Sequence, residues 1–181
     1  MAIRIYGNRK IETLSGEATR PTASKVREAL FNIWQGRVSE ARWLDLCAGS
    51  GAMGAEALCR GAAEVVGIEK SGAACRVVLQ NWQKVTKPEQ KYHVIRGDVV
   101  RQIKGLAAFD LIYFDPPYAG GLYNPVLNQL TDHLMPDGEV AVEYGGGHWS
   151  PQQLTDAALE KLEIVREKHY GSTRLVFFRR R

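Results

Sequence analysis

Four consecutive residues, Asp115-Pro116-Pro117-Tyr118, combine side chains that could hold a flat group bearing an amine. The Asp115 carboxylate can accept a hydrogen bond from an exocyclic N–H, and the ring of Tyr118 offers a face for stacking. Stacking on such a face contributes about 1–3 kcal/mol per base. The four residues follow an apolar run, 109–114, that is typical of a buried strand. The segment therefore indicates chemistry on a nucleobase.

The two prolines strengthen this interpretation, although they also allow a simpler one. Neither Pro116 nor Pro117 has an N–H, so no backbone donor competes with a bound amine. Each also restricts the residue before it to extended geometry, which directs the Asp115 side chain and the Pro116 carbonyl. The alternative is a strand that ends in an ordinary Asx-Pro turn.

A glycine-rich turn supplies the second candidate site. Gly49, Gly51 and Gly54 form the pattern G-x-G-x-x-G after an expected strand, and Glu69 lies 20 residues beyond Gly49, close to the end of the next one. This is, letter for letter, the pattern of a nicotinamide dinucleotide site. The turn therefore predicts a nucleotide-like cofactor, and its identity has to be argued from charge.

The charge around the turn favours S-adenosylmethionine over a dinucleotide. Asp45 precedes Gly49 by four residues, and its carboxylate would repel the pyrophosphate of a dinucleotide. S-adenosylmethionine has no phosphate and carries two cationic groups, which an acidic site attracts. Glu69 suits the ribose diol of either cofactor, and Asp98 could accept a hydrogen bond from an adenine amine. Alternatively, Asp45 caps the turn and Asp98 is the N-cap of a helix.

The elements that must position these residues alternate between strands and helices. This order predicts a doubly wound, mostly parallel α/β sheet that ends in an antiparallel hairpin, with ligands at the carboxyl ends of the strands. Both candidate sites follow strands and fall on that edge. The expected elements are a hairpin from 3–5 to 10–12, strands 42–46, 64–68, 92–95, 109–114 and 139–143, helices 25–34, 72–85, 99–104 and 123–134 together with one that ends at 59, a turn at 136–138, and a hairpin from 162–169 to 174–178.

The net charge of +4 is unevenly distributed along the chain. Residues 1–42 carry +4 and residues 161–181 carry +5, whereas residues 43–160 carry −5. Two basic ends on an acidic body favour contact with the phosphates of a nucleic acid. The alternative is a pair of solvated ends.

Composition limits the class of protein. With 181 residues, of which 45% are hydrophobic and 24% charged, the chain is expected to form one domain, 1–181, with a basic extension at about 1–40. No apolar stretch reaches the roughly 20 residues of a membrane span. The N-terminus does not resemble a signal peptide, so we expect a cytoplasmic protein whose cysteines, Cys47, Cys59 and Cys75, are reduced. The cysteines and histidines do not have the spacing of metal ligands, so we expect no metal and ordinary roles for His93, His133, His148 and His169.

The chain resembles the class I S-adenosylmethionine-dependent methyltransferases, and more narrowly the RsmD family, bacterial enzymes that methylate N2 of a guanine in 16S ribosomal RNA. The likeness extends from about Arg20 to Phe178, and Cys47 stands where family members often have Phe. Three blocks carry the resemblance: Arg20-Pro21-Thr22 with Val26-Arg27-Glu28-Ala29-Leu30-Phe31-Asn32, the turn 45–54 with 56–58 and 60–62, and Asp115-Pro116-Pro117-Tyr118. The first of these blocks is specific to the RsmD family.

The resemblance implies a Rossmann-like sheet of seven strands and assigns roles to individual residues. The cofactor would be surrounded by Asp45, Gly49, Ser50, Gly51, Glu69 and Asp98. Two basic residues, Lys25 and Arg27, would approach the RNA, the alternative being a solvated helix face. The substrate would be ribosomal RNA or a small-subunit assembly particle, bound by a monomer that has no membrane contact.

The expected mechanism places a flipped-out guanine on the ring of Tyr118. The Asp115 carboxylate and the Pro116 carbonyl would accept its two N–H bonds, with Pro117 also at the base, so that the nitrogen lone pair faces the methyl carbon. Asp115 would take the proton after transfer. Adenine N6 in DNA or RNA fits the same residues, so an adenine methyltransferase stays open. Methylation of a protein amide, a non-catalytic RNA-binding assembly factor and a dehydrogenase are further alternatives.

Overall fold

The computed structural model describes residues 2–14, 24–145 and 147–181. Its strands are β1 (Ala2–Ile5), β2 (Arg9–Glu12), β3 (Arg42–Leu46), β4 (Glu64–Glu69), β5 (Lys91–Arg96), β6 (Phe109–Phe114), β7 (Leu134–Gly145), β8 (Leu162–Tyr170) and β9 (Thr173–Arg180). Its α-helices are α1 (Ser24–Ile33), α2 (Ala52–Cys59), α3 (Gly72–Val85), α4 (Val99–Gln102), α5 (Tyr123–Leu130) and α6 (Asp156–Leu159). Within these ranges no helix is long and apolar enough to cross a membrane.

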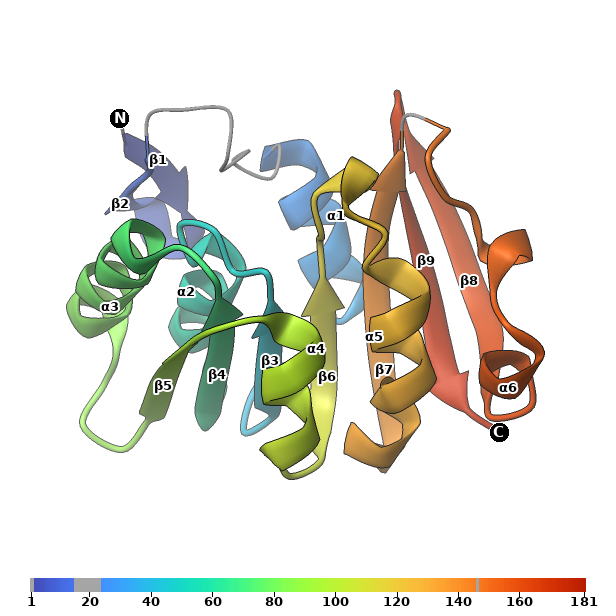
Figure 1. Cartoon of the computed structure of the whole chain (residues 1–181). Helices are drawn as coiled ribbons and strands as arrows, with labels where there is room; N and C mark the ends of the chain where they lie inside the picture. Colours follow the sequence, from blue (N-terminus) through green and yellow to red (C-terminus); the bar gives the residue numbers. More distant parts are fainter. Residues whose placement is uncertain (1, 15–23, 146) are drawn as a thin grey trace.

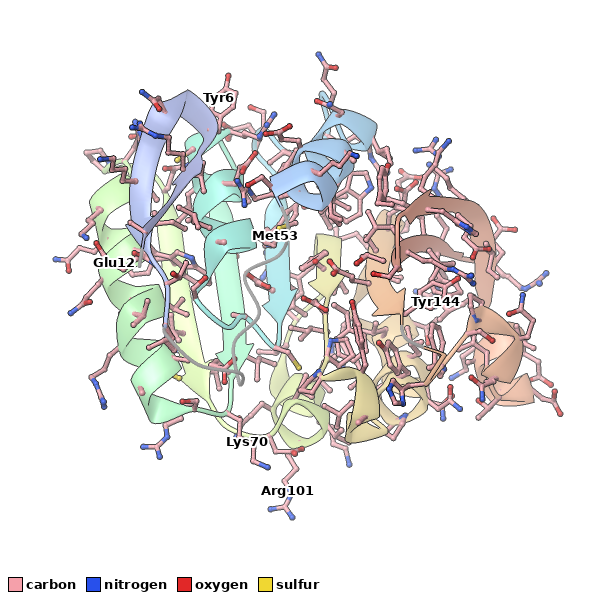
Figure 2. The ribbon with its side chains drawn as sticks, turned by 90° about the horizontal axis from the view of Figure 1, so that it is seen from above. Tyr6, Glu12, Met53, Lys70, Arg101 and Tyr144 are labelled. Atoms are coloured by element: carbon pink, nitrogen blue, oxygen red, sulfur yellow. The ribbon has the colours of Figure 1, made fainter. Side chains whose placement is uncertain are left out.

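Seven strands form one sheet in the order β5-β4-β3-β6-β7-β9-β8. The pairs from β5 through to β7 are parallel, whereas β9 runs antiparallel to both β7 and β8. The carboxyl ends of the parallel strands point upward in Figure 1, and Figure 2 looks down on this edge. The predicted fold class, a doubly wound sheet with a terminal hairpin, is confirmed.

Alternate side chains of each strand enter two separate cores, because successive residues of a strand point to opposite faces. Trp43 of β3 and Leu111 of β6 pack with helices α1, α2 and α3 on one face. Their neighbours Leu44 and Ile112 pack with α4 and α5 on the other. Both faces are thus covered by helices, as a parallel sheet of apolar strands requires.

Register brings the ends of three central strands level on the α1 face. Asp45 of β3 pairs with Tyr113 of β6, and Tyr113 in turn pairs with Ala141 of β7. Glu143 lies two residues beyond Ala141 and therefore points to the same face. The residue level with Glu143 on β6 is Asp115, immediately after the strand, since Phe114 pairs with Val142. Polar groups from distant parts of the sequence thus meet at one edge.

The predicted N-terminal hairpin is confirmed and is attached to α3 (Figure 1). Ile5 and Ile11 bury their side chains in the core of the α1 face. The Asn81 amide of α3 accepts a hydrogen bond from the Glu12 N–H and donates one to the Glu12 carbonyl, both at 2.8 Å. These two hydrogen bonds join the end of β2 to the Asn81 side chain, and they fix the orientation of the hairpin relative to α3.

The segment before Glu139 differs from the prediction. The helix expected over 123–134 ends at Leu130, continues as a short 3₁₀ helix, η4 (Thr131–His133), and β7 begins at Leu134. The turn expected at 136–138 lies inside β7. Phe109 pairs with Leu134 and Leu111 with Glu139, so residues 135–138 bulge out opposite a single residue of β6. Residues 135–138 therefore form a bulge within β7 instead of a turn before it, because β7 pairs with β6 both before and after them.

Candidate active site at the carboxyl edge of the sheet

Asp45 lies buried near the end of β3, with 2% of its surface exposed. Its Oδ2 accepts a hydrogen bond from the N–H of Gly54, at 3.0 Å, in the first turn of α2. Burial raises the pKa of the Asp45 carboxyl to about 7; the Gly54 hydrogen bond lowers it and the charge of Glu69 raises it. The capping role considered for Asp45 is thus real, and the carboxyl also titrates near neutral pH.

Two glycines of the turn are required by the packing of Trp82. A Cβ on Gly54 would lie 2.3 Å from Cζ2 of Trp82, and one on Gly51 would lie 2.8 Å from Nε1. The indole N–H also donates to the Gly51 carbonyl at 2.8 Å. Gly49 differs: its φ is +58°, and no described atom lies within 4 Å of the Cβ position. Gly49 therefore leaves space on the turn for a ligand.

Glu69, at the end of β4, anchors the glycine turn. One carboxylate oxygen accepts a hydrogen bond from the Gly49 N–H at 2.9 Å, and the other accepts one from the Ser71 N–H at 2.8 Å. Each carboxylate oxygen has a second lone pair, so Glu69 can accept further donors. Ser50 is buried in the turn, where its carbonyl accepts a hydrogen bond from Asn81 at 2.9 Å.

Asp98 follows β5 and is the N-cap of α4, where its Oδ1 accepts a hydrogen bond from the Arg101 N–H at 3.2 Å. The N-cap alternative is therefore confirmed for this side chain. The carboxylate is partly exposed at the same edge as Asp45 and Glu69, so it can also reach a ligand there.

Cys47 shows how closely the candidate carboxylates converge. Burial raises the pKa of its thiol, and the negative charges of Glu69, Asp115, Asp45 and Asp98 raise it further. These carboxylates come from the ends of four different strands, β4, β6, β3 and β5. The structure thus brings all the carboxylates predicted from the sequence into one acidic edge, which favours a cationic ligand.

The segment Asp115-Pro116-Pro117-Tyr118, which could hold a flat amine and is called the seat below, directly follows β6. The Asp115 N–H points to the Leu46 carbonyl at 3.5 Å, which ties the seat to the end of β3. Pro116 is buried, Pro117 is exposed, and Tyr118 begins a 3₁₀ helix, η3 (Tyr118–Gly120), with its ring partly exposed. Pro116 thus anchors the segment in the protein, whereas Pro117 and part of the Tyr118 ring face solvent.

Glu143 is a site residue that the sequence prediction missed. The residue is 5% exposed, and its carboxyl group accepts hydrogen bonds from the hydroxyls of Tyr113, at 2.5 Å, and Tyr118, at 3.4 Å. Burial raises the pKa of Glu143, and these two hydrogen bonds lower it. A charged residue at the end of an otherwise apolar strand, 140–144, was the available signal.

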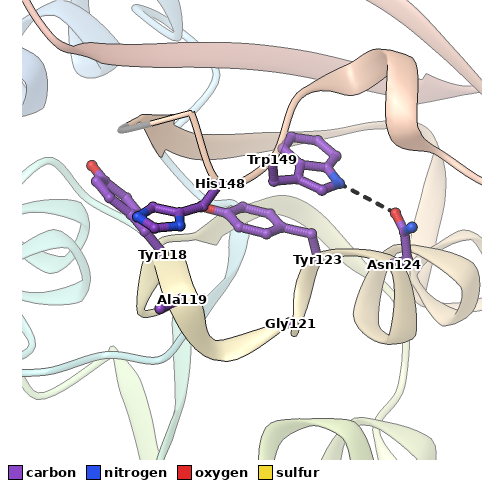
Figure 3. Close-up of a pocket in the computed structure, with 7 residues that line it drawn as sticks. All are labelled: Tyr118, Ala119, Gly121, Tyr123, Asn124, His148 and Trp149. Carbon is purple, nitrogen blue, oxygen red and sulfur yellow. Dashed lines mark hydrogen bonds between the residues drawn. The ribbon is translucent and has the colours of Figure 1, made fainter.

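A cavity of about 260 Å³ lies beside the seat (Figure 3). The sequence prediction missed it, because it treated His148 as an ordinary histidine. Its lining comes from η3, the start of α5 and the residues after β7, and consists of Tyr118, Ala119, Gly121, Tyr123, Asn124, His148 and Trp149.

Arg27 is not where the resemblance placed it. Its side chain is buried, and its guanidinium donates to Glu56 of α2 at 2.5 Å and to the Arg4 carbonyl at 2.7 Å. The prediction that Arg27 approaches RNA is wrong for this arrangement, because the residue lies on the face of α1 that packs on α2. Lys25 is exposed. The block Arg20-Pro21-Thr22 lies outside the described residues.

Comparisons with known proteins agree with this geometry. A family model, conserved hypothetical protein 95, matches residues 3–179. YlbH of Bacillus subtilis, provisionally named an rRNA methyltransferase, is 30% identical over 96% of this chain and 94% of its own. Ribosomal RNA small subunit methyltransferase D of Escherichia coli is 34% identical over 72% of this chain and 68% of its own.

The solved structure of yhhF from Escherichia coli, provisionally named a methyltransferase, is 28% identical. It superposes with a TM-score of 0.83 and covers 99% of this chain and 98% of its own. Since the family model spans nearly the whole sequence and the relatives agree with it, the chain belongs to the conserved hypothetical protein 95 family, that of the RsmD-like methyltransferases.

Proposed function

We propose that this protein transfers a methyl group from S-adenosylmethionine to the N2 amine of a guanine in small-subunit ribosomal RNA. The observation that carries the proposal is the convergence of Asp45, Glu69, Asp98 and Asp115 around Cys47, next to a seat for an aromatic amine. Such an acidic edge attracts a sulfonium and an ammonium group and repels a pyrophosphate. The small-subunit methyltransferases among the relatives support ribosomal RNA as the substrate.

The residues at the edge fit S-adenosylmethionine, which when bound supplies an electrophilic methyl group. Asp45 and the turn Gly49-Ser50-Gly51 would hold its amino acid portion, Gly49 because no described side chain lies within 4 Å of its Cβ position. Glu69 would accept the ribose hydroxyls with the lone pairs that the backbone leaves unused. Asp98 would accept the adenine amine.

The seat would orient the target amine. The Asp115 carboxylate and the Pro116 carbonyl accept its two N–H bonds, while the ring of Tyr118 supports the base and the exposed Pro117 contacts its edge. Fixed acceptors of this kind direct the nitrogen lone pair, which conjugation otherwise withdraws into the ring. Asp115 takes the proton that the nitrogen loses. Adenine N6 fits the same acceptors, and family membership favours guanine N2.

The test is methyl transfer from labelled cofactor to protein-free 16S ribosomal RNA, to small-subunit assembly particles and to DNA, with the modified nucleotide located by mass spectrometry. We expect one N2-methylguanine in the RNA. Methylation of adenine or of DNA would support the adenine enzyme instead. Calorimetry that finds no binding of S-adenosylmethionine would support the non-catalytic assembly factor.

Asp115→Ala tests the seat separately from the cofactor site. We expect methyl transfer to fall by orders of magnitude while cofactor affinity stays within about twofold, because the change removes an acceptor for the amine and leaves Asp45, Glu69 and Asp98, the carboxylates that would hold the cofactor. The matched control is Asp132→Ala, which removes an exposed carboxylate in η4 and should leave both quantities unchanged. Transfer that survives Asp115→Ala within a fewfold would exclude Asp115 from the chemistry.

A further inference from the structure

The cavity beside Tyr118 shares one wall with the seat but holds neither of its acceptors. Tyr118 lines it, whereas Asp115 and Pro116 do not. Figure 3 shows the rings of Tyr118 and His148 at one end and the pair Tyr123 and Trp149 toward the other. A ligand in this cavity would therefore lie next to the target base rather than in its place.

Part of the wall is rigid. The rings of Tyr123 and Trp149 stack with centroids 4.4 Å apart and planes inclined by 7°, and both side chains are buried. The Tyr123 hydroxyl donates to the Glu143 carbonyl at 3.2 Å, which fixes this pair to β7. A preorganised wall loses little freedom when a ligand binds.

Asn124 presents a polar group in a defined orientation. An indole N–H only donates, so the Trp149 Nε1 that lies 3.2 Å away must face the Asn124 oxygen. The amide nitrogen consequently donates to the Gln153 carbonyl, at 2.8 Å. These bonds leave the amide one lone pair and one N–H, an acceptor and a donor of the kinds that a nucleobase edge also carries.

The lining also limits the chemistry of the ligand. Among the described residues that form the wall there is no carboxylate, lysine or arginine to pair with a phosphate or an ammonium group. Aromatic and imidazole rings with one amide suit a neutral, planar ligand. The volume of about 260 Å³ is near the lower end of small-ligand pockets, which is appropriate for a single base.

We propose that this cavity binds the nucleobase next to the target in the RNA strand, stacked on the exposed ring of His148 and bonded to Asn124. The inference rests on the proposed function, since flipping the target base out also leaves its neighbour without a stacking partner. The cavity offers that neighbour a replacement, which assists extrusion and makes the enzyme sensitive to sequence beside the target.

Equilibrium binding of 16S ribosomal RNA in the presence of S-adenosylhomocysteine tests the cavity without requiring catalysis. We expect His148→Ala to weaken RNA binding about tenfold, the loss of one stacking contact, and to leave cofactor affinity unchanged. The control is His93→Ala, which removes an exposed histidine of β5, away from the cavity. A change below twofold for His148→Ala, or an equal change for both variants, would overturn the proposal.

A photoreactive benzophenone amino acid in place of His148 identifies the ligand directly. After irradiation of the complex, we expect the crosslink on a nucleotide adjacent to the methylated guanine, which is located independently with the unaltered protein. A crosslink to that guanine itself, or to a distant nucleotide, would refute the assignment. If the unaltered protein transfers no methyl group, the proposed function fails, whereas the affinities of the two histidine variants still decide whether RNA occupies the cavity.

Discussion

The hydroxyl of Tyr118 donates a hydrogen bond to the buried carboxyl group of Glu143 at 3.4 Å, although the two residues are 25 positions apart. Tyr113 donates to the other oxygen of the same carboxyl. Glu143 thereby links β6, β7 and the segment that follows β6, and it helps to determine where the ring of Tyr118 stands. We regard it as a positioning residue for the aromatic face of the seat.

Glu143→Gln should lower kcat about tenfold, because a weaker acceptor lets the ring of Tyr118 move from its productive position. Cofactor affinity should not change. Tyr118→Phe removes the same hydrogen bond. The kcat of the double variant should therefore be no lower than that of the less active single variant, and steady-state kinetics measures this non-additivity. Glu163→Gln, on the exposed part of β8, is the control. Fully additive effects would show that Glu143 does not act through Tyr118.

Cofactor binding should depend on pH through Asp45. With a pKa of about 7 in the ligand-free protein, this carboxyl is partly protonated at neutral pH. A cationic ligand binds the ionised form better, so the dissociation constant should rise by up to about tenfold for each pH unit below 7 and level off above it. Calorimetry from pH 5 to 9 measures this, and Asp45→Asn should flatten the profile. A flat profile for the unaltered protein would contradict the role of Asp45.

The same group predicts how the stability of the ligand-free protein changes with pH. The folded-state pKa of about 7 lies above the ordinary value of 3.8, so folding favours the protonated carboxyl. The contribution of Asp45 to the free energy of unfolding is fully present below about pH 4 and is lost as the pH rises to 7. Asp45→Asn keeps an acceptor for Gly54 without this loss, and in denaturant titrations at pH 8 it should be more stable than the unaltered protein.

Gly54→Ala should lower the free energy of unfolding by about 1–3 kcal/mol, because the new methyl group overlaps the Trp82 ring. Gly105→Ala is a suitable control, since its Cβ would meet no described atom within 4 Å and its φ is not positive. Urea denaturation compares the two. Equal stability of both variants would mean that Gly54 serves the ligand rather than the packing of α3.

Arg27 and Lys25 should separate stability from RNA binding. Arg27→Met removes one of the two arginines that pair with the buried Glu56, while Arg60 stays at 2.8 Å, and it should cost about 1–3 kcal/mol of stability. Lys25→Ala should leave the unfolding free energy unchanged. If Lys25 contacts a phosphate, this variant weakens RNA binding uniformly across sequences. The slope of the logarithm of the binding constant against the logarithm of the salt concentration, the salt slope, then falls in magnitude by about one. Identical salt slopes for Lys25→Ala and the unaltered protein would remove Lys25 from the RNA interface.

Local patterns were sufficient for the order of the strands and of the helices up to α5, whereas α6 was not predicted. Apolar periodicity placed β3, β6 and α3 at their observed bounds and β4 and β5 to within one residue at each end, whereas β7 begins five residues before its predicted start and ends two residues after its predicted end. A parallel sheet brings the ends of its strands to one edge, so the convergence of Asp45, Glu69 and Asp115 followed from this order alone. The same patterns could not reveal that residues 135–138 bulge within β7, because this depends on pairing with β6.

The sequence by itself thus determined the architecture and the acidic edge, since both depend on periodicity and on the types of residue that follow each strand. Only the tertiary structure decided that Arg27 is buried against Glu56, that Gly54 accommodates Trp82, and that the hydroxyl of Tyr118 meets Glu143. Each of these contacts joins residues at least 25 positions apart. Such contacts depend on strand register and on which face of a helix meets its neighbour, and no local pattern encodes either.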